Sequence, residues 1–132
     1  MHTFTLIDAQ ILLGLSYADK GVEISCVELV EGCKMENLSV PALPEFAEAF
    51  NKFLYVSAIS LNGDKIILGD FGRDIINKAR SKSSANVQAD ELVMRVLKEL
   101  ASYKLKSMCN RTVWNQAQYQ QATNTNLDTH KL

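Results

Sequence analysis

The stretch from Ile59 to Arg80, ISLNGDKIILGDFGRDIINKAR, decides the fold. Two short β-prone runs flank the dipeptide Asn62-Gly63, which is a strong signal for a hairpin with a two-residue turn. A turn at these two residues pairs Leu61 with Asp64 and gathers the apolar side chains of both strands on one face. That face holds Ile59, Leu61, Ile66 and Leu68. Asp70 follows as an N-cap, so the stretch predicts a β-hairpin with a helix directly after it.

Three helices are predicted ahead of the hairpin. Two of them begin with capping boxes, at Thr5 to Asp8 and at Ser25 to Glu28, where side chain and backbone exchange hydrogen bonds. The apolar residues after Thr5 are too dense for a helix with one buried side, so we expect the first helix in the centre of the core. Residues 22–24 are a short extended candidate, and residues 43–54 have the three-and-four spacing of an amphipathic helix.

Behind the hairpin helix, a polar break over residues 81–86 precedes a second long helix, which is predicted from Val87 to Met108. The last 18 residues contain ten Gln, Asn or Thr residues. Such a segment buries too little apolar surface to offset the entropy of an ordered chain, so we expect it to be mobile. The predicted organisation is one domain over residues 5–82, an added long helix within 83–110, and a mobile polar tail over 115–132.

The composition is that of a globular protein. The chain has 132 residues, of which 47% are hydrophobic and 22% charged, and this suits one domain with an appended element. No apolar run approaches the roughly 20 residues that cross a bilayer. The N-terminal residues lack the positive charge of a secretory signal, so we expect a cytoplasmic protein without membrane contact.

Reactive chemistry has little support in the residue types. The three cysteines, Cys26, Cys33 and Cys109, form no ligand motif, and histidine occurs only at positions 2 and 130. We expect the cysteines to be small buried or half-buried residues. The sequence has no phosphate-loop spacing and no nucleophile paired with a histidine base, so we expect no enzyme activity, no metal and no cofactor.

Charge is distributed unevenly along the chain. Residues 1–62 contain three basic and eight acidic residues, whereas residues 63–132 contain eleven basic and seven acidic ones. A molecule of this kind can bind an anion with its basic half although its total charge is close to neutral. A solvated surface with no partner is the alternative interpretation.

The order helix, short strand, helix, helix, hairpin, helix resembles the winged helix-turn-helix superfamily. The best-matching stretch is Phe50 to Ala79, and the resemblance covers roughly residues 5–80. The matching elements are the helix end Phe53-Leu54, the bend Ser57-Ala58, the strand at Ile59, the turn Asn62-Gly63, the strand Ile66-Ile67-Leu68 and the helix start Asp70-Phe71-Gly72-Arg73. The expected fold class is therefore mainly α with a small β-hairpin, an α+β winged helix with an added C-terminal helix.

The resemblance implies a small transcriptional regulator that binds duplex DNA as a homodimer. In the family the helix before the hairpin usually enters the major groove, and the wing touches phosphates or the minor groove. The candidate DNA contacts are Asn51, Lys52, Asn62, Lys65, Arg73, Lys78 and Arg80. The candidate dimerisation residues are Val93, Val96, Leu97, Leu100 and Tyr103, although the same stripe is compatible with packing on its own domain.

A second hypothesis comes from the charge of the helix over residues 43–54. Its outward positions include Glu45 and Glu48, with Lys52 as the only cation, and carboxylates oppose the attraction to phosphate on which DNA affinity depends. The alternative function is a winged-helix protein-interaction module without direct DNA binding. Glu45, Glu48 and Trp114 would then contact the partner, and Trp114 could instead dock on its own domain.

Overall fold

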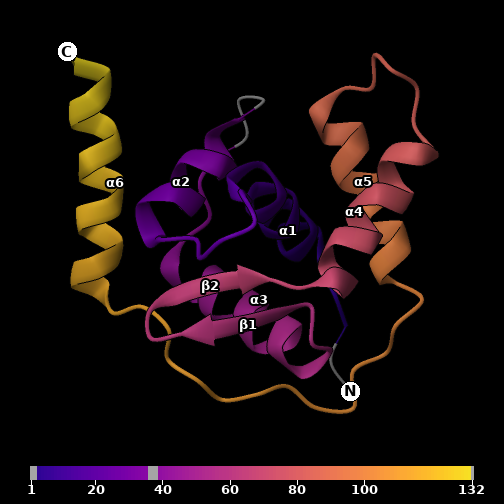
Figure 1. Ribbon diagram of the computed structural model, residues 1–132, viewed down its shortest axis with the longest axis horizontal. Coiled ribbons are helices and arrows are strands. Elements are labelled where there is room, and N and C mark those ends of the chain that lie inside the picture. The colour runs from indigo at the N-terminus through magenta and orange to yellow at the C-terminus, as the bar shows by residue number, and fades with distance from the viewer. Residues whose placement is uncertain (1–2, 36–38, 132) are drawn as a thin grey trace.

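The computed structural model describes residues 3–35 and 39–131, with side chains described as far as residue 124 (Figure 1). Over these residues the protein is mainly helical with one two-stranded antiparallel hairpin, so the predicted α+β class is confirmed. The elements are α1 (Leu6–Ala18), α2 (Cys26–Lys34), α3 (Leu43–Tyr55), β1 (Ile59–Asn62), β2 (Lys65–Leu68), α4 (Asp70–Ser81), α5 (Ala89–Leu100) and α6 (Gln116–Lys131).

Helix α1 lies in the centre of the core, as its dense apolar pattern predicts. It contacts α2, α3, α4 and α5. Its capping box is present: the Thr5 hydroxyl accepts from the Asp8 amide at 3.2 Å, and the Asp8 carboxylate accepts from the Thr5 amide at 2.8 Å. The second predicted box, between Ser25 and Glu28, starts α2 in the same way.

Two glycines allow α1 and α2 to approach each other closely. A Cβ atom on Gly32 would overlap the carbonyl oxygen of Gly14, and a Cβ on Gly14 would lie 2.7 Å from the Cys33 sulfur. Because Gly14 and Gly32 have no Cβ atom, α1 and α2 can pack at this short distance from each other. Cys33 is buried and Cys26 is half-buried, as expected.

The hairpin has a different register from the predicted one. The pairs are Ile59 with Leu68, Ser60 with Ile67, Leu61 with Ile66, and Asn62 with Lys65. The turn residues are therefore Gly63 and Asp64, and the predicted turn at Asn62-Gly63 is wrong. A turn there needs positive φ at both residues, but the positive φ angles of the described residues are at Gly21, Ser57 and Gly63. The predicted apolar face holds, because Ile59, Ile66 and Leu68 are buried and Leu61 is half-buried.

A third short segment pairs with the hairpin. The amide of Ile24 donates to the carbonyl of Ile66 at 2.7 Å, and the amide of Ile66 donates back at 2.9 Å. This bridge confirms the extended candidate at residues 22–24 for Ile24 alone. It ties the connection between α1 and α2 to β2.

The second long helix is shorter than predicted. Helix α5 begins at Ala89 and ends at Leu100, not at Met108. Beyond it the Tyr103 ring packs edge-on against Phe71, and Leu105 is fully buried. A continuing helix would carry these side chains away from the domain, so the chain turns at the end of α5 to bury them.

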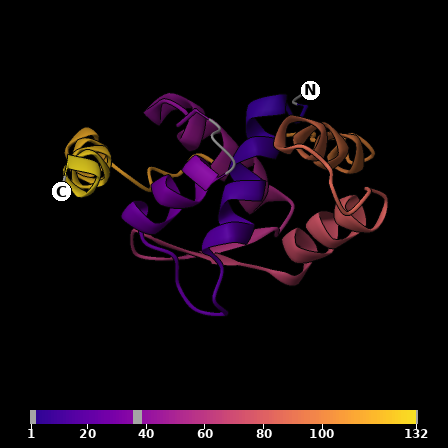
Figure 2. The same ribbon diagram turned by 90° about the horizontal axis from the view of Figure 1, so that it is seen from above.

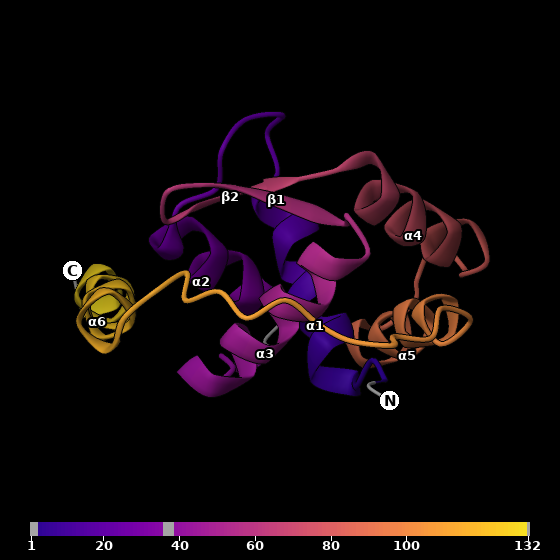
Figure 3. The same cartoon turned by 90° about the horizontal axis from the view of Figure 1, so that it is seen from below.

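Residues 101–115, here called the strap, connect α5 to α6. The strap contains no helix and crosses the width of the molecule beneath α3 (Figure 3). Helix α6 then lies beside α2, at the opposite end of the molecule from α4 and α5 (Figure 2).

The polar tail forms a helix in the structure. The first turns of α6 are docked, since the Tyr119 hydroxyl donates to the Pro41 carbonyl at 2.7 Å and Ala122 is buried. These two residues supply the apolar contacts that the composition as a whole obscures. The mobility expected for the tail stays a prediction, and Leu132 lies outside the described residues.

Helix α3 ends in a left-handed residue that is not glycine. Ser57 has a φ of 62°. The Ala58 amide donates to the Phe53 carbonyl at 2.9 Å, and the Ser57 amide donates to Leu54 at 3.2 Å. This is the Schellman arrangement, in which glycine is the preferred left-handed residue.

We expect Ser57→Gly to stabilise the protein by about 1 kcal/mol, because it removes the cost of a left-handed conformation at a residue with a Cβ. Ser60→Gly is the matched control, since Ser60 is exposed in the extended β1 and glycine weakens a strand. Chemical unfolding of both variants measures the difference. A loss of stability in Ser57→Gly would contradict the argument.

Candidate interaction surface

Helix α3 has one buried side and one acidic side. Phe46, Phe50 and Phe53 are buried, whereas Glu48 is exposed and Glu45 is half-exposed. The first turn is prepared by Pro44, and the Glu45 carboxylate accepts from the Ala42 amide at 2.8 Å. Glu45 and Glu48 therefore lie on the outer side of α3, where the sequence predicts them.

Lys52 does not lie on the outside, and its assignment as a DNA contact is wrong. Only 2% of the residue is exposed. Its ammonium lies 2.8 Å from an oxygen of Asp8 and 3.2 Å from an oxygen of Glu48. A lysine can bury its methylene stem and still bring its charge to a carboxylate, and the first turn of α1 supplies that carboxylate.

Asn51 is also buried, so it is not a DNA contact either. Its side-chain amide donates to the Arg111 carbonyl at 3.0 Å and accepts from the Arg111 amide at 2.7 Å. Its own carbonyl accepts from the Cys109 amide at 3.2 Å. The side chain of Asn51 therefore pairs with the strap much as a neighbouring strand would.

Trp114 anchors the far end of the strap. The residue is 4% exposed, with ring centroids 5.2 Å from Phe46 and 4.9 Å from Phe50. Its indole N–H donates to the Asp64 carbonyl at 2.9 Å. Of the two roles considered for Trp114, the structure shows docking on its own domain, and its ring is not offered to a partner.

The other five candidate DNA contacts differ in their surroundings: some pair with a carboxylate of their own chain, and the others are exposed. Lys65 and Asn62 both contact Glu23. Arg73 donates to Asp19 at 2.8 and 3.1 Å, and these hydrogen bonds lower the pKa of the Asp19 carboxyl. Lys78 and Arg80 are exposed on α4, where the Arg80 guanidinium lies over the Tyr17 ring.

The apolar stripe of α5 packs on its own chain. Helix α5 contacts α1 and α4. Val93, Val96 and Leu100 are buried, and Leu97 is half-buried. Tyr103 lies beyond the helix, against Phe71. Of the two alternatives for this stripe, the structure shows packing on its own domain, and it gives no support to a dimer through these residues.

A groove of about 500 Å³ lies between the first turn of α1 and the outer side of α3. The residues that line it are Thr5, Leu6, Ile7, Asp8, Glu45 and Glu48. Leu6 is 47% exposed and supplies apolar surface, and the two glutamates supply charge. We call this the acidic groove. The sequence did not reveal the part played by residues 5–8, because their pattern indicates only a helix start and a core.

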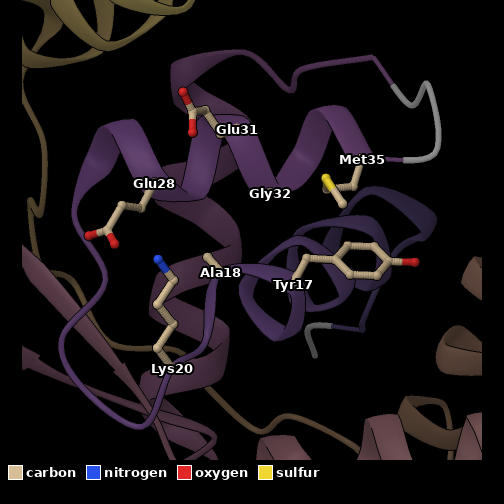
Figure 4. Close-up of a pocket in the computed structure, with 7 residues that line it drawn as sticks. All are labelled: Tyr17, Ala18, Lys20, Glu28, Glu31, Gly32 and Met35. Atoms are coloured by element: carbon tan, nitrogen blue, oxygen red, sulfur yellow. The ribbon is translucent and has the colours of Figure 1, made fainter.

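A second, smaller hollow of about 160 Å³ lies between the end of α1 and α2 (Figure 4). Lys20 extends toward Glu28 in this view. The Glu28 carboxylate accepts from the Ser25 amide at 2.9 Å, and this bond lowers the pKa of the carboxyl. Of the polar groups of this hollow, Glu28 therefore takes part in the cap of α2.

Reactive groups are not gathered at either site. Among the side chains that the structure describes, in residues 3–35 and 39–124, no three His, Cys, Asp or Glu residues form a group that could hold a metal ion. Burial raises the pKa of the Cys26 and Cys33 thiols to about 12, so both stay protonated at neutral pH. Over the same part of the chain, no helix is long and apolar enough to cross a membrane.

Comparison with protein-family models, with curated proteins and with solved structures finds no match to this chain. The acidic groove therefore has to be interpreted from its own residues. It combines exposed apolar surface with a rim of carboxylates, which is the chemistry of a surface that binds a cationic, partly apolar segment.

We expect Lys52→Met to lower the free energy of unfolding by about 3 kcal/mol or more, because it leaves the Asp8 carboxylate buried without its cation. Lys78→Met, on the exposed side of α4, is the control and should change stability by less than about 0.5 kcal/mol. Adding Asp8→Asn to Lys52→Met should recover part of the loss, since no charge is then left buried. If Lys52→Met and Lys78→Met have the same free energy of unfolding, the ion pair does not stabilise the fold.

Proposed function

We propose that this chain is a winged-helix protein-interaction module whose acidic groove binds a cationic segment of a partner protein. The order of elements supports the winged-helix part of the proposal, since helix, bridge, helix, helix and hairpin follow one another as in that superfamily. The observation that carries the function is the composition of the acidic groove, together with the burial of Lys52, the only cation of α3.

Carboxylates outnumber cations around the acidic groove. Asp8, Glu45 and Glu48 stand against the single ammonium of Lys52, which is turned inward. An arriving lysine or arginine can place its head between the exposed Glu48 and the half-exposed Glu45, and its methylene stem on Leu6. Charge then guides the encounter, and the apolar contact adds to affinity.

Reading of duplex DNA by α3 has less support. The exposed side of α3 carries carboxylates, and residues 109–114 of the strap lie against its other flank through Asn51 and Trp114. A phosphate backbone would meet repulsion where it needs cations. The wing tip is also engaged, because Asp64 accepts from both Trp114 and Gln118.

The test of partner binding uses a fluorescein-labelled helical peptide with Leu on one face and Lys on the other, at the three-and-four spacing of an amphipathic helix, and a matched peptide with Glu in place of Lys. We expect fluorescence anisotropy to show binding of the Lys peptide only, weakening with added salt. Glu48→Lys should weaken binding about fivefold or more. Asp74→Lys is the matched control, since Asp74 is exposed on α4 and the charge change is the same.

Thermal unfolding of each variant verifies that it is folded, and Glu45→Lys repeats the test at a position that does not contact Lys52. Equal binding of the Lys and Glu peptides would contradict the proposal. So would binding of the Lys peptide that is unchanged in both Glu45→Lys and Glu48→Lys.

The test against DNA reading uses a labelled random-sequence duplex at low salt. We expect no binding at micromolar concentrations of the wild-type protein, because α3 presents carboxylates to the phosphates. Reversing both Glu45 and Glu48 to lysine should increase affinity for the duplex. Wild-type binding that falls in Lys65→Ala and Lys78→Ala would instead support a DNA-binding protein.

A further inference from the structure

The outer surface of α5 has the chemistry that the acidic groove requires. A shallow hollow of about 420 Å³ there is lined by Glu91, Met94, Arg95, Leu97 and Lys98. Met94 is 55% exposed and Lys98 is exposed. Two further exposed lysines, Lys104 and Lys106, follow at the start of the strap. We call Met94, Arg95 and Lys98 the cationic surface.

The cations of this surface form no ion pair with a carboxylate of the described residues, although Glu91 lines the same hollow. Within the described part of the chain, neither Arg95 nor Lys98 forms an ion pair, and Nε of Arg95 is buried without an acceptor. Neighbouring cations differ, since Lys82 pairs with Glu99 and Arg73 pairs with Asp19. The charges of Arg95 and Lys98 are therefore left for an external anion.

The distribution of charge along the chain points to the same pairing. Residues 1–74 contain five basic and eleven acidic residues, whereas residues 75–115 contain eight basic and three acidic ones. Each copy of the protein therefore carries an acidic part and a basic part. Two copies can satisfy both at once, which a foreign cationic protein cannot do.

The elements that carry the two surfaces lie side by side. Helices α3, α1 and α5 form an array on the side of the molecule away from the hairpin (Figures 2 and 3), and α1 contacts both of its neighbours. The acidic groove belongs to the α3 end of this array and the cationic surface to the α5 end. An array that is acidic at one end and basic at the other is complementary to itself under a two-fold rotation.

We infer that the cationic segment bound by the acidic groove is the α5 surface of a second copy of this chain, in a reciprocal two-fold dimer. The inference rests on the proposed function and names its partner. Lys98 of one copy meets Glu48 of the other, and the flexible side chain of Met94 packs toward Leu6. Both contacts occur twice, and the buried stripe of α5 has no part in them.

The test is sedimentation of the wild-type protein over a concentration series at low and high salt. We expect a monomer–dimer equilibrium that shifts toward monomer as salt is added. Glu48→Lys and Lys98→Glu should each raise the dissociation constant about tenfold or more, because each places two like-charge pairs in the dimer. Asp74→Lys and Lys78→Glu make the same charge changes outside both surfaces and should leave the dimer unchanged.

Mixing the two disruptive variants gives the sharpest result. In a heterodimer of Glu48→Lys with Lys98→Glu, one contact has both charges reversed and the other has the native charges. Both contacts are then attractive, so we expect the mixture to associate where neither variant does alone. The same result shows that both variants are folded.

The outcomes separate the inference from the proposed function. A protein that stays monomeric while the Lys peptide still binds overturns the dimer and leaves the interaction module standing. A monomer that also fails to bind the peptide overturns both. A dimer that is insensitive to Glu48→Lys and Lys98→Glu overturns this pairing, as does a mixture of those variants that fails to associate.

Discussion

The ion pair between Lys52 and Asp8 is the constraint on which the rest of this structure depends. Removing two charges from water costs several kcal/mol for each, and a buried pair is tolerated only where the geometry is good. Here the ammonium lies 2.8 Å from the carboxylate, and Asp8 also accepts from the amide of Thr5. The pair therefore joins the start of α1 to the last turn of α3, and it sets the position of α3 relative to the core.

The same pair sets the character of the surface. Because the only cation of α3 is turned inward, the exposed side of the helix is left with Glu45 and Glu48. The first turn of α1, held beside them, adds the apolar surface of Leu6. A structural interaction that stabilises the domain thus also produces an acidic groove, and no separate set of residues is needed to build it.

The strap has a comparable double effect. The side chain of Asn51 donates one hydrogen bond to the backbone of Arg111 and accepts another from it. Trp114 packs against Phe46 and Phe50. These contacts complete the core beside α3. They also cover one flank of α3 and attach the strap to the hairpin tip at Asp64. The helix that the family resemblance assigned to DNA is consequently packed between the core and the strap.

Much of this protein was determined by the local sequence. The capping boxes at Thr5 and Ser25, the dense apolar run of α1 and the apolar face of the hairpin each depend on neighbours a few residues apart, and each formed as predicted, although the turn and register of the hairpin did not. The tertiary structure decided the positions of Asn51 and Lys52, the end of α5 and the docking of Trp114. The positions of Asn51, Lys52 and Trp114 depend on partners 44 to 60 residues away along the chain. Periodicity shows that a helix has a buried side, but which polar residue enters the core is decided by the partner that folding brings to it.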